Sequence, residues 1–131
     1  MSEMANSEES TGLETNFKPA DIQQYKSVKK WIESVNGGSD PTEMAEHINL
    51  LSEFCNFEHL DPDELILRCV RTLKDESKAI STKGRREIES AIKAFVANRN
   101  KTGREAIVEE NKLRSFFVHN GIFMQGRAAI F

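Results

Sequence analysis

The feature that most constrains the fold is a helical period of apolar side chains that continues from residue 21 onward. Apolar residues recur three or four positions apart, the spacing that places them on one face of an α-helix. Two segments, Asp40-Pro41-Thr42-Glu43 and Asp61-Pro62-Asp63-Glu64, each combine a capping aspartate, a first-turn proline and a glutamate that can reach back to the cap. No segment alternates with period two for long enough to indicate a strand. The sequence therefore predicts an all-α fold.

We expect a compact bundle of about five short helices joined by short loops. The expected elements are a helix from residue 21 to Asn36-Gly37-Gly38, helices that begin at Asp40 and Asp61, a helix over about 84–98, and a helix opened by a Thr102-Gly103-Arg104-Glu105 capping box. The apolar stripe of the third helix continues to Leu73, and a polar stretch over residues 74–83 follows it. Gly121 is expected to cap the last helix.

The 131 residues fit one domain, and their net charge of −3 is unevenly distributed. Residues 1–20 hold four glutamates and one lysine, which predicts a flexible acidic tail. The remaining 17 basic and 17 acidic residues balance each other. We expect a tail over residues 1–20, a helical domain over 21–123 and a C-terminal extension over 124–131.

Neither a secretory signal nor an apolar run long enough to cross a membrane is present in the sequence. Cys55 and Cys69 fall within apolar helical patterns, so we expect reduced thiols in the core of a cytoplasmic protein. Gly37-Gly38 lacks the Lys-Ser/Thr of a phosphate loop, and the three histidines are scattered. Cys55 and His59 share a helical spacing, but two ligands are too few for structural zinc. We therefore expect no catalytic residue, no metal site, no cofactor and no small-molecule substrate.

Charge is segregated along the chain. Residues 68–104 contain eleven basic and four acidic residues, whereas residues 40–64 contain eight acidic residues and no lysine or arginine. A basic segment of this size can neutralise phosphates of a nucleic acid. Two alternatives remain open at this point: a solvated surface with chance segregation, and head-to-tail docking of the acidic and basic segments between copies.

The last predicted helix adds a geometric argument. With Leu113 at the centre of its inward face, a rotation of 100° per residue places Arg104 and Ser115 on the outer side, together with Val108 and Asn111. Lys112 and Arg114 flank the inward face. Arginine, asparagine and serine can contact bases and phosphates, and the free N–H groups near Lys101 and Thr102 can bind an anion.

Five features occur in a particular order: Ser27-Val28-Lys29-Lys30-Trp31-Ile32, a Ser-x-x-Thr step from Ser39 to Thr42, Leu50-Leu51-Ser52-Glu53-Phe54-Cys55, Leu60-Asp61-Pro62-Asp63-Glu64-Leu65-Ile66, and Lys112-Leu113-Arg114-Ser115-Phe116-Phe117-Val118-His119-Asn120-Gly121-Ile122. This order resembles the N-terminal core-binding domain of tyrosine recombinases, the SAM-like domain of phage-type and archaeal integrases. The resemblance covers roughly residues 26–122. It implies a helical clamp that binds double-stranded DNA and helps protomers to assemble on it during DNA integration or recombination.

The resemblance also implies contact residues: Thr42 and His47 in the second helix, and the closing helix from Lys101. Glu43 and Glu46 make the second helix acidic, which favours the basic segment and the closing helix instead. The family's catalytic residues lie in a following domain, and Tyr25 lies on an apolar stripe, so we expect no strand cleavage. The predicted DNA-binding residues are Lys83, Arg85, Arg86, Arg99, Lys101, Thr102, Arg104, Lys112 and Arg114.

The leading hypothesis is a non-catalytic DNA-binding domain of the integrase type, cytoplasmic and nucleoid-associated, that uses phosphate and groove contacts. The alternative hypothesis is a helical protein–protein interaction module that self-associates through its acidic and basic segments.

Overall fold

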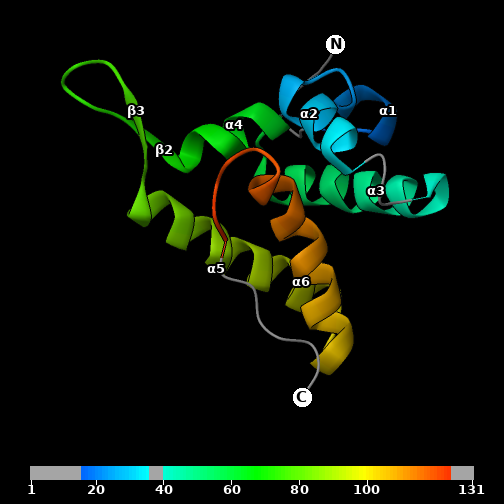
Figure 1. Cartoon of the computed structure of the whole chain (residues 1–131). Helices are drawn as coiled ribbons and strands as arrows, with labels where there is room; N and C mark the ends of the chain where they lie inside the picture. Colours follow the sequence, from blue (N-terminus) through cyan, green and yellow to red (C-terminus); the bar gives the residue numbers. More distant parts are fainter. Residues whose placement is uncertain (1–15, 36–39, 125–131) are drawn as a thin grey trace, which may run out of the picture.

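The computed structural model describes residues 16–35 and 40–124 as six helices and one two-stranded hairpin (Figure 1). The elements are α1 (Pro19–Ile22), α2 (Lys26–Val35), α3 (Pro41–Glu58), α4 (Pro62–Arg68), β2 (Val70–Thr72), β3 (Lys78–Ile80), α5 (Thr82–Asn98) and α6 (Gly103–Val118). The prediction of a compact, mostly helical fold is confirmed. No helix in the described ranges combines the length and the apolar character needed to cross a membrane.

The two aspartate caps form as the sequence predicts. The Asp40 carboxylate accepts a hydrogen bond from the Glu43 backbone N–H at 2.7 Å. The backbone N–H of Asp61 donates to the Glu64 carboxylate at 2.9 Å, and the Glu64 N–H donates back at 2.8 Å, which completes a capping box. The prediction of a capping box at Thr102 is wrong, because the Thr102 side chain makes no capping hydrogen bond. Thr102 still occupies the N-cap position with an extended backbone, and Gly103, the first residue of α6, has φ of +58°.

Gly121 ends α6 as expected. Its φ is +88°, and the Ile122 N–H behind it donates to the Phe117 carbonyl at 2.9 Å. This six-to-one hydrogen bond is the mark of a Schellman motif, in which glycine adopts the left-handed turn at no steric cost. The motif reverses the chain and buries Ile122 against the core.

The β2–β3 hairpin is a correction to the sequence-based prediction. The apolar stripe that suggested a third helix as far as Leu73 belongs to a helix only up to Arg68. Val70 then pairs with Ile80 in an antiparallel ladder. The Ser81 N–H donates to the Cys69 carbonyl at 2.8 Å, so the base of the hairpin occupies the backbone group that a longer helix would have used.

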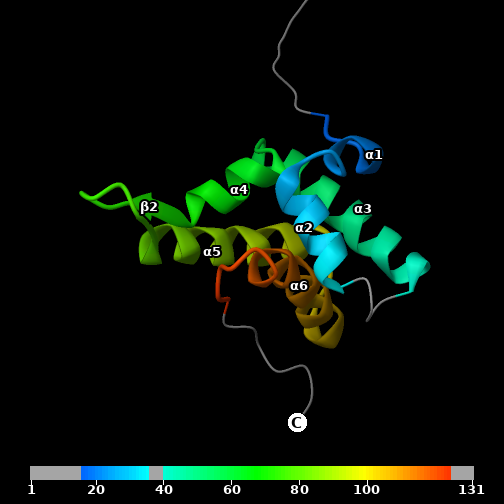
Figure 2. The same ribbon diagram turned by 45° about the horizontal axis from the view of Figure 1, so that its top comes forward.

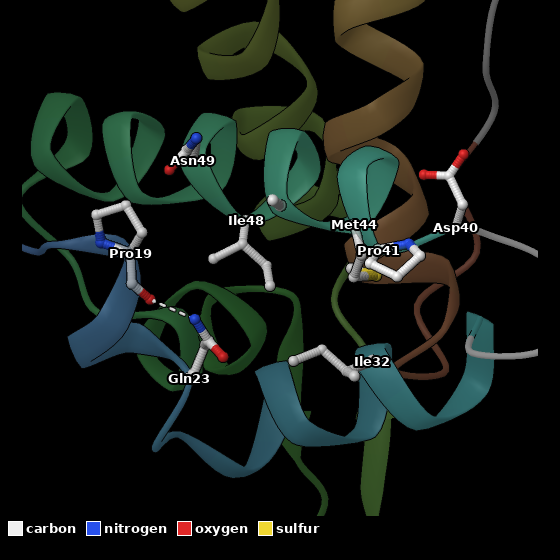
Figure 3. Close-up of a pocket in the computed structure, with 9 residues that line it drawn as sticks. Pro19, Gln23, Ile32, Asp40, Pro41, Met44, Ile48 and Asn49 are labelled. Atoms are coloured by element: carbon white, nitrogen blue, oxygen red, sulfur yellow. Dashed lines mark hydrogen bonds between the residues drawn. The ribbon is translucent and has the colours of Figure 1, made fainter.

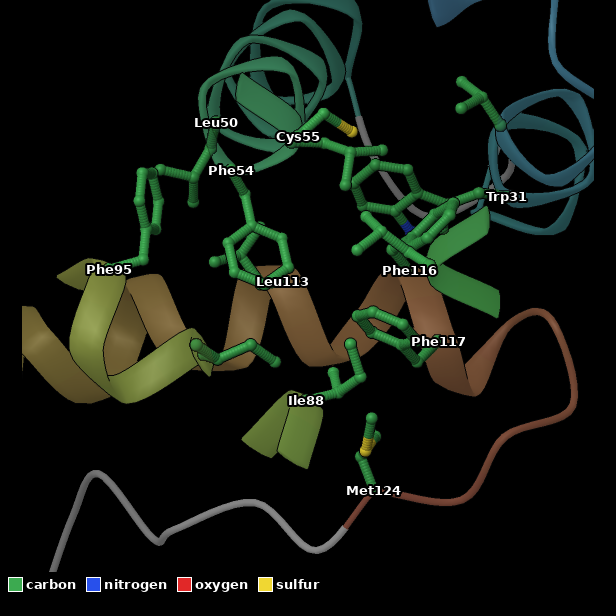
Figure 4. Close-up of a cluster of buried hydrophobic side chains, with 14 of the residues drawn as sticks. Trp31, Leu50, Phe54, Cys55, Ile88, Phe95, Leu113, Phe116, Phe117 and Met124 are labelled. Atoms are coloured by element: carbon green, nitrogen blue, oxygen red, sulfur yellow. The ribbon is translucent and has the colours of Figure 1, made fainter. Parts of the chain in front are cut away.

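The core lies where α2, α3, α5 and α6 meet (Figure 4). Trp31 packs edge-on against Phe116, with ring centroids 5.4 Å apart, and Phe116 packs in the same way against Phe117. Leu113 is fully buried beneath them. Cys55 is also buried in this core, and both it and Cys69 are free thiols, which confirms the expectation of reduced core cysteines.

The folded part begins before residue 21. Phe17 exchanges two hydrogen bonds with the Asn56 side chain, at 2.6 and 3.0 Å, and α1 starts at Pro19. The first predicted helix is divided into α1 and α2 by a turn over residues 23–25. Residues 1–15, 36–39 and 125–131 lie outside the described part, so most of the predicted tail, the Gly37-Gly38 stop and most of the predicted C-terminal extension also lie outside it.

Candidate nucleic-acid interface

The predicted site residues fall into two groups at opposite ends of α5. Lys83, Arg85 and Arg86 occupy its first turns beside the hairpin, whereas Arg99 lies just past its last residue (Figure 2). Fourteen residues separate Arg85 from Arg99, which is about 21 Å along a helix. The structure therefore does not bring the predicted residues together into one patch.

The first group belongs to a larger cationic surface that the site prediction missed. Its further members come from the end of α4 and from the hairpin, and all of them are exposed. We call this surface the basic edge: Arg68, Arg71, Lys74, Lys78, Lys83, Arg85 and Arg86. Residues 68–86 contain seven basic and two acidic residues, a net charge of +5.

The cations of the basic edge are not neutralised by the fold. The ion pairs among residues 16–35 and 40–124 involve Arg99, Lys112 and Arg114, and none involves a residue of the basic edge. Lys78 donates to the Thr72 hydroxyl at 2.8 Å, which leaves its charge uncompensated. Arg71 and Lys78 lie on opposite faces of the hairpin, because Lys78 pairs with Thr72 and Arg71 pairs with Ala79. Exposed cations without carboxylate partners are nevertheless the electrostatic footprint of a phosphate-binding surface.

The second group is interleaved with carboxylates. Arg99 pairs with Glu109 at 2.9 Å and with Glu53, and its guanidinium lies 5.5 Å from the centre of the Phe95 ring. The hydrogen bond that Arg99 donates to the Glu109 carboxylate is the main cause that raises the pKa of Arg99. Arg99 thus closes an ion-pair bridge between α3 and α6, and its charge is compensated within the fold.

The remaining cations near the start of α6 have acidic neighbours as well. Lys112 Nζ lies 4.0 Å from a Glu46 carboxylate oxygen. Thr102 and Arg104 are exposed, and Lys101 is partly exposed. A shallow depression of about 320 Å³ gathers these side chains together with acidic and apolar ones: Lys101, Arg104, Glu105, Val108, Glu109 and Lys112. This mixed surface attracts phosphates less than the basic edge does.

Arg114, one of the predicted site residues, is buried in the structure. Its side chain is only 4% exposed, and its Nε donates to Glu89 at 2.8 Å. A second nitrogen reaches Glu110 on its own helix at 3.3 Å, and a third donates to Asn111 at 2.8 Å. All three guanidinium nitrogens are engaged inside the protein, so the structure does not favour the predicted contact between Arg114 and DNA.

The outer stripe predicted for the closing helix is only partly exposed. Arg104 and Val108 face solvent, but Ser115 accepts a hydrogen bond from Trp31 Nε1 at 3.1 Å and so faces α2. Within α3, His47 stacks edge-on against Trp31 with ring centroids 5.7 Å apart. Ser115 and His47 therefore help to hold α2, α3 and α6 together, and the contact implied for His47 is not favoured.

A groove of about 500 Å³ opens between α1, α2 and the start of α3 (Figure 3). Its apolar floor includes Ile32, Met44 and Ile48. Two of its polar side chains already have partners, since Asp40 caps α3 and the Gln23 amide donates to the Pro19 carbonyl at 3.2 Å. The groove therefore lacks the convergent polar groups that a catalytic site requires. Among the described residues, no cluster of three or more histidine, cysteine or carboxylate side chains is arranged to hold a metal ion.

No protein-family model, no curated protein and no solved structure matches this chain. Charge and geometry therefore carry the functional argument. The sequence did contain the signal for the missed residues: four of the cations counted in the basic segment lie at the end of α4 and in the hairpin, namely Arg68, Arg71, Lys74 and Lys78. Their importance follows only from the hairpin, which presents them beside Lys83 and Arg86.

Proposed function

We propose that this chain is a non-catalytic domain that binds double-stranded DNA. Its class would be the core-binding domain of tyrosine recombinases and of phage-type and archaeal integrases, acting in DNA integration or recombination at the nucleoid. The observation that carries the proposal is the basic edge, a set of cations without carboxylate partners at the junction of α4, the hairpin and α5, all exposed except the partly buried Arg85.

The mechanism is non-covalent. Each phosphate that a lysine or arginine neutralises releases a condensed counterion, and the logarithm of the binding constant then falls by about 0.9 per contact for each tenfold rise in salt. If six members of the basic edge contact phosphates, the expected slope is about −5. The paired cations Arg99 and Arg114 contribute nothing to this slope, because their charges are compensated in the free protein.

Binding of a 30-base-pair fluorescent duplex, measured by anisotropy from low to moderate salt, tests the proposal. The Lys83→Gln/Arg86→Gln variant is expected to reduce the slope by about two units. The matched control, Lys18→Gln/Lys29→Gln, removes two exposed cations, one just before α1 and one in α2, and is expected to keep the slope. Absence of duplex binding by the unaltered chain even at low salt would overturn the proposal.

A second candidate function is a protein–protein interaction module. The acidic residues of the segment 40–64 lie on α3 and at the start of α4, and the apolar groove between α1, α2 and α3 adds an unfilled surface. A chain with these two faces can bind a second copy head to tail without DNA. Sedimentation velocity separates the two functions: self-association that salt abolishes, together with no duplex binding, would favour the interaction module.

A further inference from the structure

The β2–β3 hairpin has a specific role on the basic edge. Resting on the DNA-binding function proposed above, we infer that the hairpin is a rigid arm that enters the major groove of the bound duplex, while Lys83 and Arg86 hold the phosphates beside it. The chain's resemblance to helical core-binding domains predicts no such arm.

The first argument is shape. The hairpin projects from the helical body in both views, attached only at its base (Figures 1 and 2). From Arg71 to Lys78, every side chain except the half-buried Leu73 is exposed. Two paired strands lie about 4.8 Å apart, and the major groove of B-DNA, about 12 Å wide, admits a two-stranded ribbon. The minor groove, about 6 Å wide, is too narrow for one.

The second argument is rigidity. At the tip, Asp75 accepts hydrogen bonds from the Ser77 N–H at 3.0 Å and from the Ser77 hydroxyl at 2.6 Å, and the Leu73 N–H donates to the Ser77 carbonyl at 2.8 Å. At the base, Gly84 of α5 packs directly on the Arg68 carbonyl. An arm fixed at both ends loses little conformational entropy when it binds.

The third argument is the placement of charge. Arg71 and Lys78 are exposed on the strands, whereas the tip carries the carboxylates of Asp75 and Glu76 beside a single cation, Lys74, and so has a net charge of −1. Two carboxylates at the tip would be repelled by a row of phosphates. Inside the major groove, a carboxylate can accept from cytosine N4, and an arginine can donate two hydrogen bonds to guanine. The charge pattern therefore fits insertion into the groove better than contact across the backbone.

The experiment combines groove-specific competitors with one hairpin variant. The probe is a mixed-sequence 30-base-pair DNA duplex, and the competitors are methyl green, a major-groove ligand, and netropsin, a minor-groove ligand. We expect methyl green to displace the protein and netropsin to leave it bound. We also expect Arg71→Gln to weaken binding roughly tenfold, because a bidentate arginine–guanine contact is worth about that much. Lys29→Gln, an exposed cation on α2, is the matched control.

The outcomes separate the arm from the DNA-binding function. Two outcomes would overturn the proposal that the hairpin enters the major groove but leave the proposed DNA-binding function intact. In the first, the unaltered chain binds duplex DNA and netropsin alone displaces it. In the second, Arg71→Gln binds as tightly as the control. Equal binding of duplex RNA would also overturn the arm, because side chains cannot enter the deep, narrow major groove of A-form RNA. If the chain binds no duplex at all, both proposals fail. Circular dichroism verifies that the variants remain folded.

Discussion

A Cβ atom added to Gly84 would lie 1.7 Å from the carbonyl oxygen of Arg68. The first turn of α5 is thus pressed against the last turn of α4, at a distance that only glycine permits. The Ser81 hydroxyl accepts from the Gly84 N–H at 3.0 Å and caps α5 at the same point. This contact sets the direction in which the hairpin leaves the helical body, so the basic edge depends on a residue without a side chain.

Gly84→Ala is expected to destabilise the domain and to displace the hairpin. The added methyl group clashes with backbone, which cannot rotate away as a side chain can, and overpacking of this kind costs about 1–3 kcal/mol. Urea denaturation measures the loss, and amide chemical shifts of Cys69 and Ser81 report the displacement. Ser90→Ala, on the exposed side of α5, is the neutral control. Because alanine favours helices over glycine by about 1 kcal/mol, a gain in stability at position 84 would show that the contact is not tight.

The helix boundaries that the sequence predicted correctly depend on local chemistry. A capping aspartate followed by proline favours a helix start whatever packs against it, so α3 and α4 begin as expected. The glutamate reaches back to the cap only in α4, where Glu64 completes the capping box. Local chemistry also explains Gly121, whose left-handed φ requires no tertiary contact. These features could be predicted because the residues that cause them are neighbours in the chain.

The features that the sequence did not predict depend on distant residues. The apolar stripe from Leu65 to Leu73 suits a helix and a helix-plus-strand equally well, and the contact between Gly84 and Arg68 accompanies the second arrangement. Arg114 was placed correctly on the flank of its helix, but periodicity on one helix cannot say which neighbour covers that flank. In the structure α5 covers it with Glu89, which converts a predicted DNA contact into an internal ion pair.

Arg114→Met is expected to destabilise the domain by about 3–5 kcal/mol in urea denaturation, because it removes the positive charge between two carboxylates, one of them almost fully buried. Adding Glu110→Gln to this variant is expected to recover part of the loss, since replacing both partners avoids a buried charge. The control Arg104→Met, an exposed site, should change the free energy of unfolding by less than about 0.5 kcal/mol. If Arg114→Met reduced the salt slope of DNA binding while leaving stability intact, the internal role of Arg114 would be contradicted.

Substitution of a buried and of an exposed leucine tests which residues form the core. Leu113 is 0% exposed beneath the aromatic side chains of the core, whereas Leu67 on α4 is 65% exposed. Leu113→Ala is expected to cost about 2–5 kcal/mol, from the lost burial and the cavity that remains, whereas Leu67→Ala should cost less than about 0.5 kcal/mol. Thermal and urea denaturation of the two variants provide the comparison, and similar losses at both positions would contradict the assigned core.

The buried thiols predict how stability depends on alkaline pH. Burial raises the pKa of Cys69 from 9.0 to about 11, and burial raises the pKa of Cys55 as well. Above pH 9 the thiols of the unfolded chain lose their protons while those of the folded chain keep them, so the free energy of unfolding falls as pH rises toward 11. The slope is at most about 1.4 kcal/mol per pH unit for each thiol.

Urea denaturation at pH 8, 9 and 10.5 measures this dependence, and the Cys55→Ala/Cys69→Ala variant is its control. The variant starts from a lower stability, because removal of two buried sulfur atoms leaves small cavities. Its stability should nevertheless decline less steeply above pH 9. Burial also raises the pKa of Tyr25, which lowers stability in the same direction in both proteins, so only the difference between the two slopes reports the thiols. Equal slopes would show that neither cysteine is shielded from solvent in the folded state.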